Sequence, residues 1–139
     1  MKLFFGLATA IVQAHFNLVV PLSIEQTKPI EMGDIYNIAN IHCELTAQGS
    51  QGEGCASSNT SLGKLMLRGN EAEQVLITVT PVTNNSVSFT PIFDNGKQTL
   101  SVSLSSIATE ISIGGAITVA ESADLGPQSI SYLIEVNYQ

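Results

Sequence analysis

Apolar residues alternate with other residues along much of this chain, and this period of two constrains the fold more than any other feature. In an extended strand, side chains at every second position point to the same face of the sheet. From residue 15 onward, no convincing stretch places apolar residues at the i, i+3, i+4 and i+7 positions of an amphipathic helix. The sequence therefore predicts an all-β fold.

The longest alternating stretches lie at the two ends of the chain, where five apolar residues occupy successive even positions. The N-terminal set is Phe16, Leu18, Val20, Leu22 and Ile24, and the C-terminal set is Ile130, Tyr132, Ile134, Val136 and Tyr138. Pro21 lies on the opposite face of the first stretch and has no N–H to donate. The N-terminal strand is therefore expected at a sheet edge or in the groove of a partner.

Shorter strands are expected between the two ends, each bounded by Gly, Pro, Asn or Asp. They fall around residues 30–35, 62–67, 75–79, 87–93, 100–104 and 111–119. Asn95-Gly96 predicts a tight hairpin turn, and Gly114-Gly115 predicts a bulge or a close approach of two backbones. About seven or eight strands in one short chain predict a single two-sheet sandwich of the immunoglobulin type.

The charge balance excludes nucleic acid as the main partner. Only 12% of the residues are charged, and five basic residues stand against twelve acidic ones, which gives a formal net charge of −7. Affinity for nucleic acid comes from neutralising several phosphates with Lys and Arg, and this chain lacks the residues to do so.

The first residues predict export from the cell. Lys2 precedes an apolar run over residues 3–12, and Val12-x-Ala14 resembles a cleavage site, so residues 1–14 are expected to be a signal peptide. The run is too short to cross a bilayer as a helix, and no direct insertion into a membrane is expected. The alternative is a buried first strand or helix. An N-terminal extension (15–27) and an immunoglobulin-like domain (28–139) would follow.

Cys43 and Cys55 are expected to form a disulfide that closes a short loop rich in Gly and Ser. The alternative is a metal site that adds His42 to the two cysteines. Because the paired C-x-x-C or H-x-x-x-H spacing of metal sites is missing, the disulfide is favoured.

The sequence offers little for catalysis. His15 and His42 have no evident partner, and the chain contains no Gly-x-Ser-x-Gly elbow, no H-E-x-x-H pattern and no phosphate-binding Gly-rich loop. Glu71 and Glu73 are more simply explained as part of a solvated turn. We therefore expect a protein without enzymatic activity, metal or cofactor, and a small hydrolase is the weakest of the alternatives.

The two terminal stripes favour assembly by strand addition. When a strand adds to a sheet edge, main-chain hydrogen bonds give affinity and alternate side chains enter pockets, which requires a period of two. An apolar, almost uncharged edge strand would make a monomer prone to aggregate. In a subunit that polymerises, such a strand would be the joint.

The C-terminal stretch from Gly126 to Gln139 resembles the last strand of bacterial chaperone–usher pilus subunits, which has a penultimate Tyr and a Gly fourteen residues from the end. Tyr138 is penultimate here, and Gly126 is the fourteenth residue from the end. The segments 30–35 and 113–117 also resemble those of a family of short secreted bacterial immunoglobulin-like proteins with a similar ending.

The resemblance implies an incomplete immunoglobulin-like fold that lacks its last strand and is completed by a strand from a neighbouring subunit. The donor residues would be Phe16, Leu18, Val20, Leu22 and Ile24. The acceptor groove would lie along Ile130, Tyr132, Ile134, Val136 and Tyr138, with Gly126 just before them. The disulfide would match the single early bridge of that family.

The partners that the resemblance implies are identical subunits in a polymer, together with a periplasmic chaperone and an outer-membrane usher. The chain would then be a secreted subunit of a cell-surface filament that supports adhesion or biofilm formation. The alternative is a complete, self-contained sandwich, in which case the protein would be a monomeric secreted module that binds a glycan or a protein.

Overall fold

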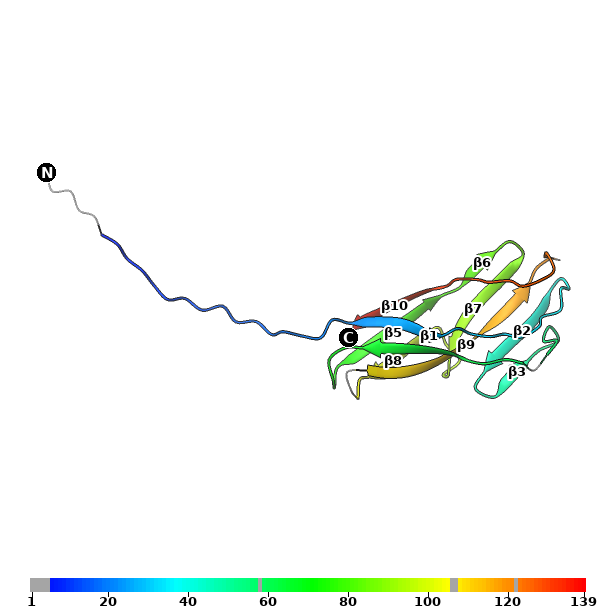
Figure 1. Ribbon diagram of the computed structural model, residues 1–139, viewed down its shortest axis with the longest axis horizontal. Helices are drawn as coiled ribbons and strands as arrows, with labels where there is room; N and C mark the ends of the chain where they lie inside the picture. Colours follow the sequence, from blue (N-terminus) through cyan, green and yellow to red (C-terminus); the bar gives the residue numbers. More distant parts are fainter. Residues whose placement is uncertain (1–5, 58, 106–107, 122) are drawn as a thin grey trace.

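The computed structural model describes residues 6–57, 59–105, 108–121 and 123–139 (Figure 1). Within these ranges the chain forms ten strands. They are β1 (Ser23–Lys28), β2 (Ile41–Thr46), β3 (Gly49–Gln51), β4 (Gly63–Arg68), β5 (Gln74–Thr80), β6 (Val82–Asn84), β7 (Val87–Phe93), β8 (Thr99–Ser103), β9 (Ala108–Val119) and β10 (Leu133–Tyr138). The predicted all-β fold is confirmed.

The strands form two antiparallel sheets, as expected of a β-sandwich. The larger sheet has seven strands in the order β1-β4-β9-β2-β3, and β7 joins it through β9 while β6 pairs with β7. The smaller sheet has the order β10-β5-β8. The long strand β9 organises the larger sheet, because its first half pairs with β4 and its second half pairs with both β2 and β7.

The core lies between the two sheets and follows the predicted alternation. From the larger sheet, Leu65 and Leu67 of β4 and Ile113 of β9 point inward, and from the smaller sheet Val75 and Ile77 of β5 do the same. All five side chains are almost fully buried. Burial of a side chain of this size contributes about 1.5–3 kcal/mol, so these positions account for much of the stability of the domain.

Most of the expected inner strands are present, but the segment 30–35 is not a strand. It makes only two isolated bridges, between Glu31 and Ser61 and between Ile35 and Cys55. Gly33 adopts a φ of 74°, which interrupts the extended backbone between the two bridges. The pair β2 and β3, which forms most of the loop between Cys43 and Cys55, was not anticipated.

Of the two alternatives expected at Gly114-Gly115, the close approach to neighbouring strands is confirmed. No bulge is present, because both glycines pair in register with β7. A Cβ atom on Gly114 would collide with the carbonyl oxygen of Leu45, and one on Gly115 would lie 2.5 Å from the ring of Phe89. Both glycines are therefore needed for β9 to pack closely against its neighbours.

The terminal strands are shorter than the alternation predicts. β1 begins at Ser23 and β10 at Leu133, although the expected stretches begin at residues 16 and 130. Residues 6–22 belong to no strand and extend away from the sandwich as a tail (Figure 1). A strand needs a hydrogen-bonded neighbour, and no other described segment pairs with residues 16–22. The described residues contain no helix long and apolar enough to cross a membrane.

Candidate strand-docking groove

A groove separates β1 from β10. In the described part of the chain, β1 pairs only with β4 and β10 pairs only with β5, so one edge of each strand has no strand partner. A hollow of about 220 Å³ lies between these two edges, with Ile24 and Gln26 on one wall and Tyr132 and Ile134 on the other. An unpaired strand edge offers its N–H and C=O groups to an incoming strand.

The groove continues past the ends of both strands. A second hollow of about 710 Å³ shares Gln26 and Tyr132 with the first, and a third of about 610 Å³ shares Ile35 and Ile117 with the second. Together the three hollows follow the segments 24–37 and 123–134, and we call them the terminal groove. It is long enough to receive an extended strand rather than a compact ligand.

The walls of the terminal groove carry partly exposed apolar side chains. Ile24 and Ile30 lie on one wall, and Ile130, Tyr132 and Ile134 lie on the other. These half-buried groups still have apolar surface that a docked strand would remove from water, and burial of such surface is favourable by about 25 cal/mol per Å².

The predicted acceptor residues fall in or beside this groove. Ile130, Tyr132 and Ile134 line it, and Val136 packs against the core further along β10. The other two stand at opposite ends of the segment. Tyr138 closes β10, and Gly126, with a φ of 109°, lines the third hollow.

Tyr132 occupies a distinctive position on the groove wall. Its ring packs against Phe89 with centroids 5.8 Å apart, and its hydroxyl oxygen is buried with no hydrogen-bond partner among the described residues. Burial raises the pKa of the Tyr132 phenol above its ordinary value of 10.0, because the charged form is desolvated.

The structure divides the predicted donor stripe into an exposed part and a docked part. Phe16 and Leu18 are 77% and 91% exposed. Val20 is half-buried, while Leu22 and Ile24 pack against the core of their own chain. The boundary between free tail and folded domain therefore falls near Val20, inside the extension that the sequence assigned to residues 15–27.

The exposed part of the stripe also reaches further back than expected. Val12, 86% exposed, and Ala14 continue the even-numbered apolar positions, with the polar Gln13, His15 and Asn17 between them. The alternation was visible in the sequence, but residues 12 and 14 were assigned to the predicted signal peptide. The first five residues of that peptide lie outside the described residues.

The free tail matches the terminal groove in length and chemistry. At about 3.3 Å per residue, residues 6–19 extend over about 46 Å, and the groove-side segment 123–134 extends over at most about 40 Å. This match uses residues 6–14, so it requires that the chain keeps them and does not lose them as a signal peptide. Residues 6–22 contain no Asp, Glu, Lys or Arg. The tail can therefore enter an apolar groove without burying a charge.

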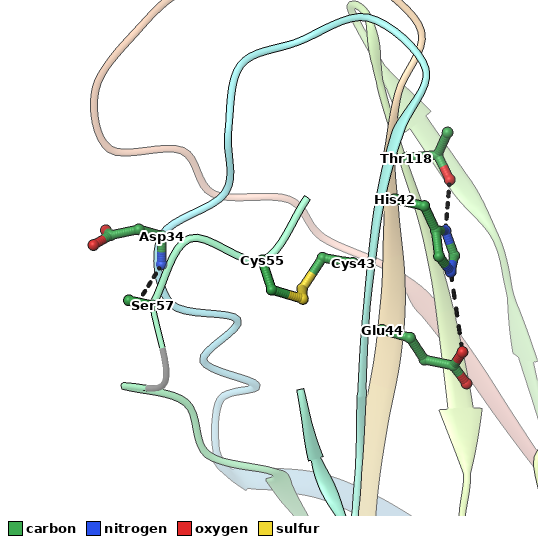
Figure 2. Close-up of a disulfide and its surroundings, with 7 residues drawn as sticks. All are labelled: Asp34, His42, Cys43, Glu44, Cys55, Ser57 and Thr118. Atoms are coloured by element: carbon green, nitrogen blue, oxygen red, sulfur yellow. Dashed lines mark hydrogen bonds and ion pairs between the residues drawn. A yellow bond between two sulfur atoms is a disulfide. The ribbon is translucent and has the colours of Figure 1, made fainter. Parts of the chain in front are cut away.

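The predicted disulfide is present between Cys43 of β2 and Cys55, with Cα atoms 5.0 Å apart (Figure 2). His42 points to the other side of β2, where Nδ1 lies 3.3 Å from the Thr118 hydroxyl and Nε2 lies 4.0 Å from a Glu44 carboxylate oxygen (Figure 2). Among the described residues, no cluster of three His, Cys, Asp or Glu side chains has a geometry that could hold a metal ion.

No model of a known protein family matches this chain, and no curated protein matches its sequence.

Proposed function

We propose that this protein is a structural subunit of an extracellular filament, in which the tail of one copy docks as a strand in the terminal groove of the next. One combination of features supports this most strongly. Among the described residues, the same chain carries an exposed, uncharged apolar stripe and a long groove that begins between two strand edges without a strand partner. In this proposal the domain is an incomplete immunoglobulin-like sandwich.

The docked strand would be held by two kinds of contact. Its main chain would bond to the free edge of β10 or β1, which supplies affinity that is independent of sequence. Its even-numbered side chains, above all Phe16 and Leu18, would cover Ile130, Tyr132 and Ile134. The odd-numbered side chains would face solvent, as Gln13, His15 and Asn17 are suited to do. Leu22 and Ile24 would stay on their own core and would not act as donors.

The arrangement of the two sites favours a chain of copies over a closed dimer. The tail leaves the domain where β10 ends (Figure 1). The terminal groove begins further back along β10, at Ile134, and reaches Gly126. Joining a tail to a groove is a contact between two different surfaces, and a repeated contact of this kind builds an open filament.

The disulfide suits an oxidising compartment, which supports an exported protein. The proposed role of the protein is to build a cell-surface filament that promotes adhesion or biofilm formation. The stretch from Gly126 to Tyr138 resembles the last strand of chaperone–usher pilus subunits, so we also propose a periplasmic chaperone and an outer-membrane usher as partners. A chaperone would protect the free apolar tail and the open groove before assembly.

The sharpest test compares two neighbouring residues of the tail, Leu18 and Val19. Both are apolar and exposed, at 91% and 61%, so neither is needed by its own domain. Leu18 lies on the stripe and Val19 on the opposite face. We expect Leu18→Asp to abolish filaments seen by negative-stain electron microscopy and to remove the ladder on unboiled gels, because it would bury a carboxylate in the groove. Val19→Asp should assemble nearly as well as the unaltered protein.

Equal loss in both variants would show that assembly does not depend on one face of the tail. An unaltered protein that stays monomeric at every concentration would contradict the filament and favour a self-contained binding module.

A further inference from the structure

Two side chains hold the backbone of the tail at the point where it leaves the domain. The N–H of Val20 donates to the Oδ1 atom of Asn70 at 2.7 Å, and the C=O of Val20 accepts from the hydroxyl of Tyr138 at 3.1 Å. The same hydroxyl accepts from the N–H of Asn70 at 2.9 Å. We call Val20, Asn70 and Tyr138 the tail clamp.

The clamp is built from parts of the chain that are far apart in sequence. Asn70 lies in the connection between β4 and β5, and Tyr138 is the last residue of β10. Gly69 packs beside them so closely that a Cβ atom there would lie 2.9 Å from the Tyr138 hydroxyl and 3.1 Å from Leu22. The tail is therefore anchored to both sheets at once.

The clamp also fixes the direction of the tail. Ile24 and Gln26 line the groove opposite Tyr132 and Ile134, while Val20 contacts Tyr138, so β1 and β10 run in opposite directions. To enter its own groove, the tail would have to turn back at residues 20–22. Pro21 opposes such a turn because it restricts Val20 to an extended conformation, and the two hydrogen bonds to Val20 would have to break.

We propose that the tail clamp determines which groove the tail fills, an inference that rests on the filament assembly proposed above. A tail on the same chain is present at an effective concentration on the order of millimolar, far above that of a second copy in dilute solution. Without a barrier, each copy would complete itself. The clamp holds the tail outward and leaves the groove free for the next copy.

The test uses a tryptophan reporter in the full chain, which contains no Trp of its own. Phe16→Trp places the reporter on the exposed stripe. At concentrations below assembly, its emission should be that of a solvent-exposed indole, freely quenched by acrylamide. Adding Tyr138→Phe, which keeps the ring and removes the hydroxyl, should shift the emission to the blue independently of concentration. The population of self-docked tail should rise about fivefold for the lost hydrogen bond, and filament yield should fall.

Thr83→Val is the control, because it removes a hydrogen-bonded hydroxyl from β6, away from both the clamp and the terminal groove. Asn70→Ala breaks the other bond to Val20 and provides a second variant if Tyr138→Phe does not fold. The clamp proposal is overturned if both clamp variants fold, keep an exposed reporter and assemble like the unaltered protein. If the unaltered protein forms no filaments, the assembly proposal fails, but the reporter in the monomer still decides whether Tyr138 and Asn70 direct the tail.

Discussion

Tyr132 and Tyr138 lie six positions apart near the C-terminus, yet their hydroxyls have opposite environments. The hydroxyl of Tyr138 makes two hydrogen bonds in the tail clamp, whereas that of Tyr132 is buried without a partner among the described residues. Burying a hydroxyl without a hydrogen bond costs about 1–3 kcal/mol. The hydroxyl of Tyr132, unlike its ring, therefore lowers the stability of the isolated domain.

We expect Tyr132→Phe to raise the free energy of unfolding by about 1 kcal/mol, because the ring contact with Phe89 is kept and the unsatisfied hydroxyl is removed. Urea denaturation at neutral pH measures this change. A variant that is less stable than the unaltered protein would mean that the hydroxyl is satisfied in solution.

Tyr132 also makes the free energy of unfolding depend on pH in the alkaline range. Since burial raises the pKa of its phenol above 10.0, the unfolded chain ionises first as the pH rises. The contribution of Tyr132 to stability is thus complete below pH 10 and is lost as the pH rises through the higher pKa of the folded state. Above pH 10, the free energy of unfolding should therefore fall less steeply with pH in Tyr132→Phe than in the unaltered protein.

At the scale of the strand, alternation predicted most elements that bury one face in their own chain, but it missed β2, although Cys43 and Leu45 of that strand are buried. β4 and β5 were found because Leu65, Leu67, Val75 and Ile77 all face the core. β3 was missed because Gly49–Gln51 contains no apolar residue and is held only by its pairing with β2. The period of two could not show that the N-terminal stripe divides near Val20, because it carries no information on which chain provides the neighbouring strand.

The contact between β9 and β2 provides a prediction at the same scale. Gly114→Ala should destabilise the domain by about 3 kcal/mol or prevent folding, because the added methyl group collides with the backbone of Leu45. Gly49→Ala serves as the control. Gly49 has open space around it and only an unfavourable φ of 108°, so a loss of about 1–2 kcal/mol is expected. Thermal unfolding of the two variants gives the comparison, and equal losses would contradict the close packing of β9.

For the whole molecule, the tail and the sandwich are separable. All ten strands of the described residues, and the whole tail clamp, lie from Val20 onward. A chain that begins at Val19 should therefore unfold at nearly the same temperature as the full chain but form no filaments. It keeps a groove and has no tail, so traces of it should shorten the filaments of the full chain by closing one end of each.

Electron microscopy of mixtures in defined ratios measures this shortening. Filaments built by the truncated chain alone would show that the tail is not the joint between copies.

The absence of charge in residues 6–22 has a consequence for the medium in which such a filament could persist. In the proposed filament the tail brings no acidic or basic side chain into the groove, so dissolved salt has no attraction there to screen. The formal net charge of −7 makes the copies repel one another, and salt weakens that repulsion. In the proposed filament, such a joint would therefore tighten as the salt concentration rises, whereas a joint held by surface charges would weaken.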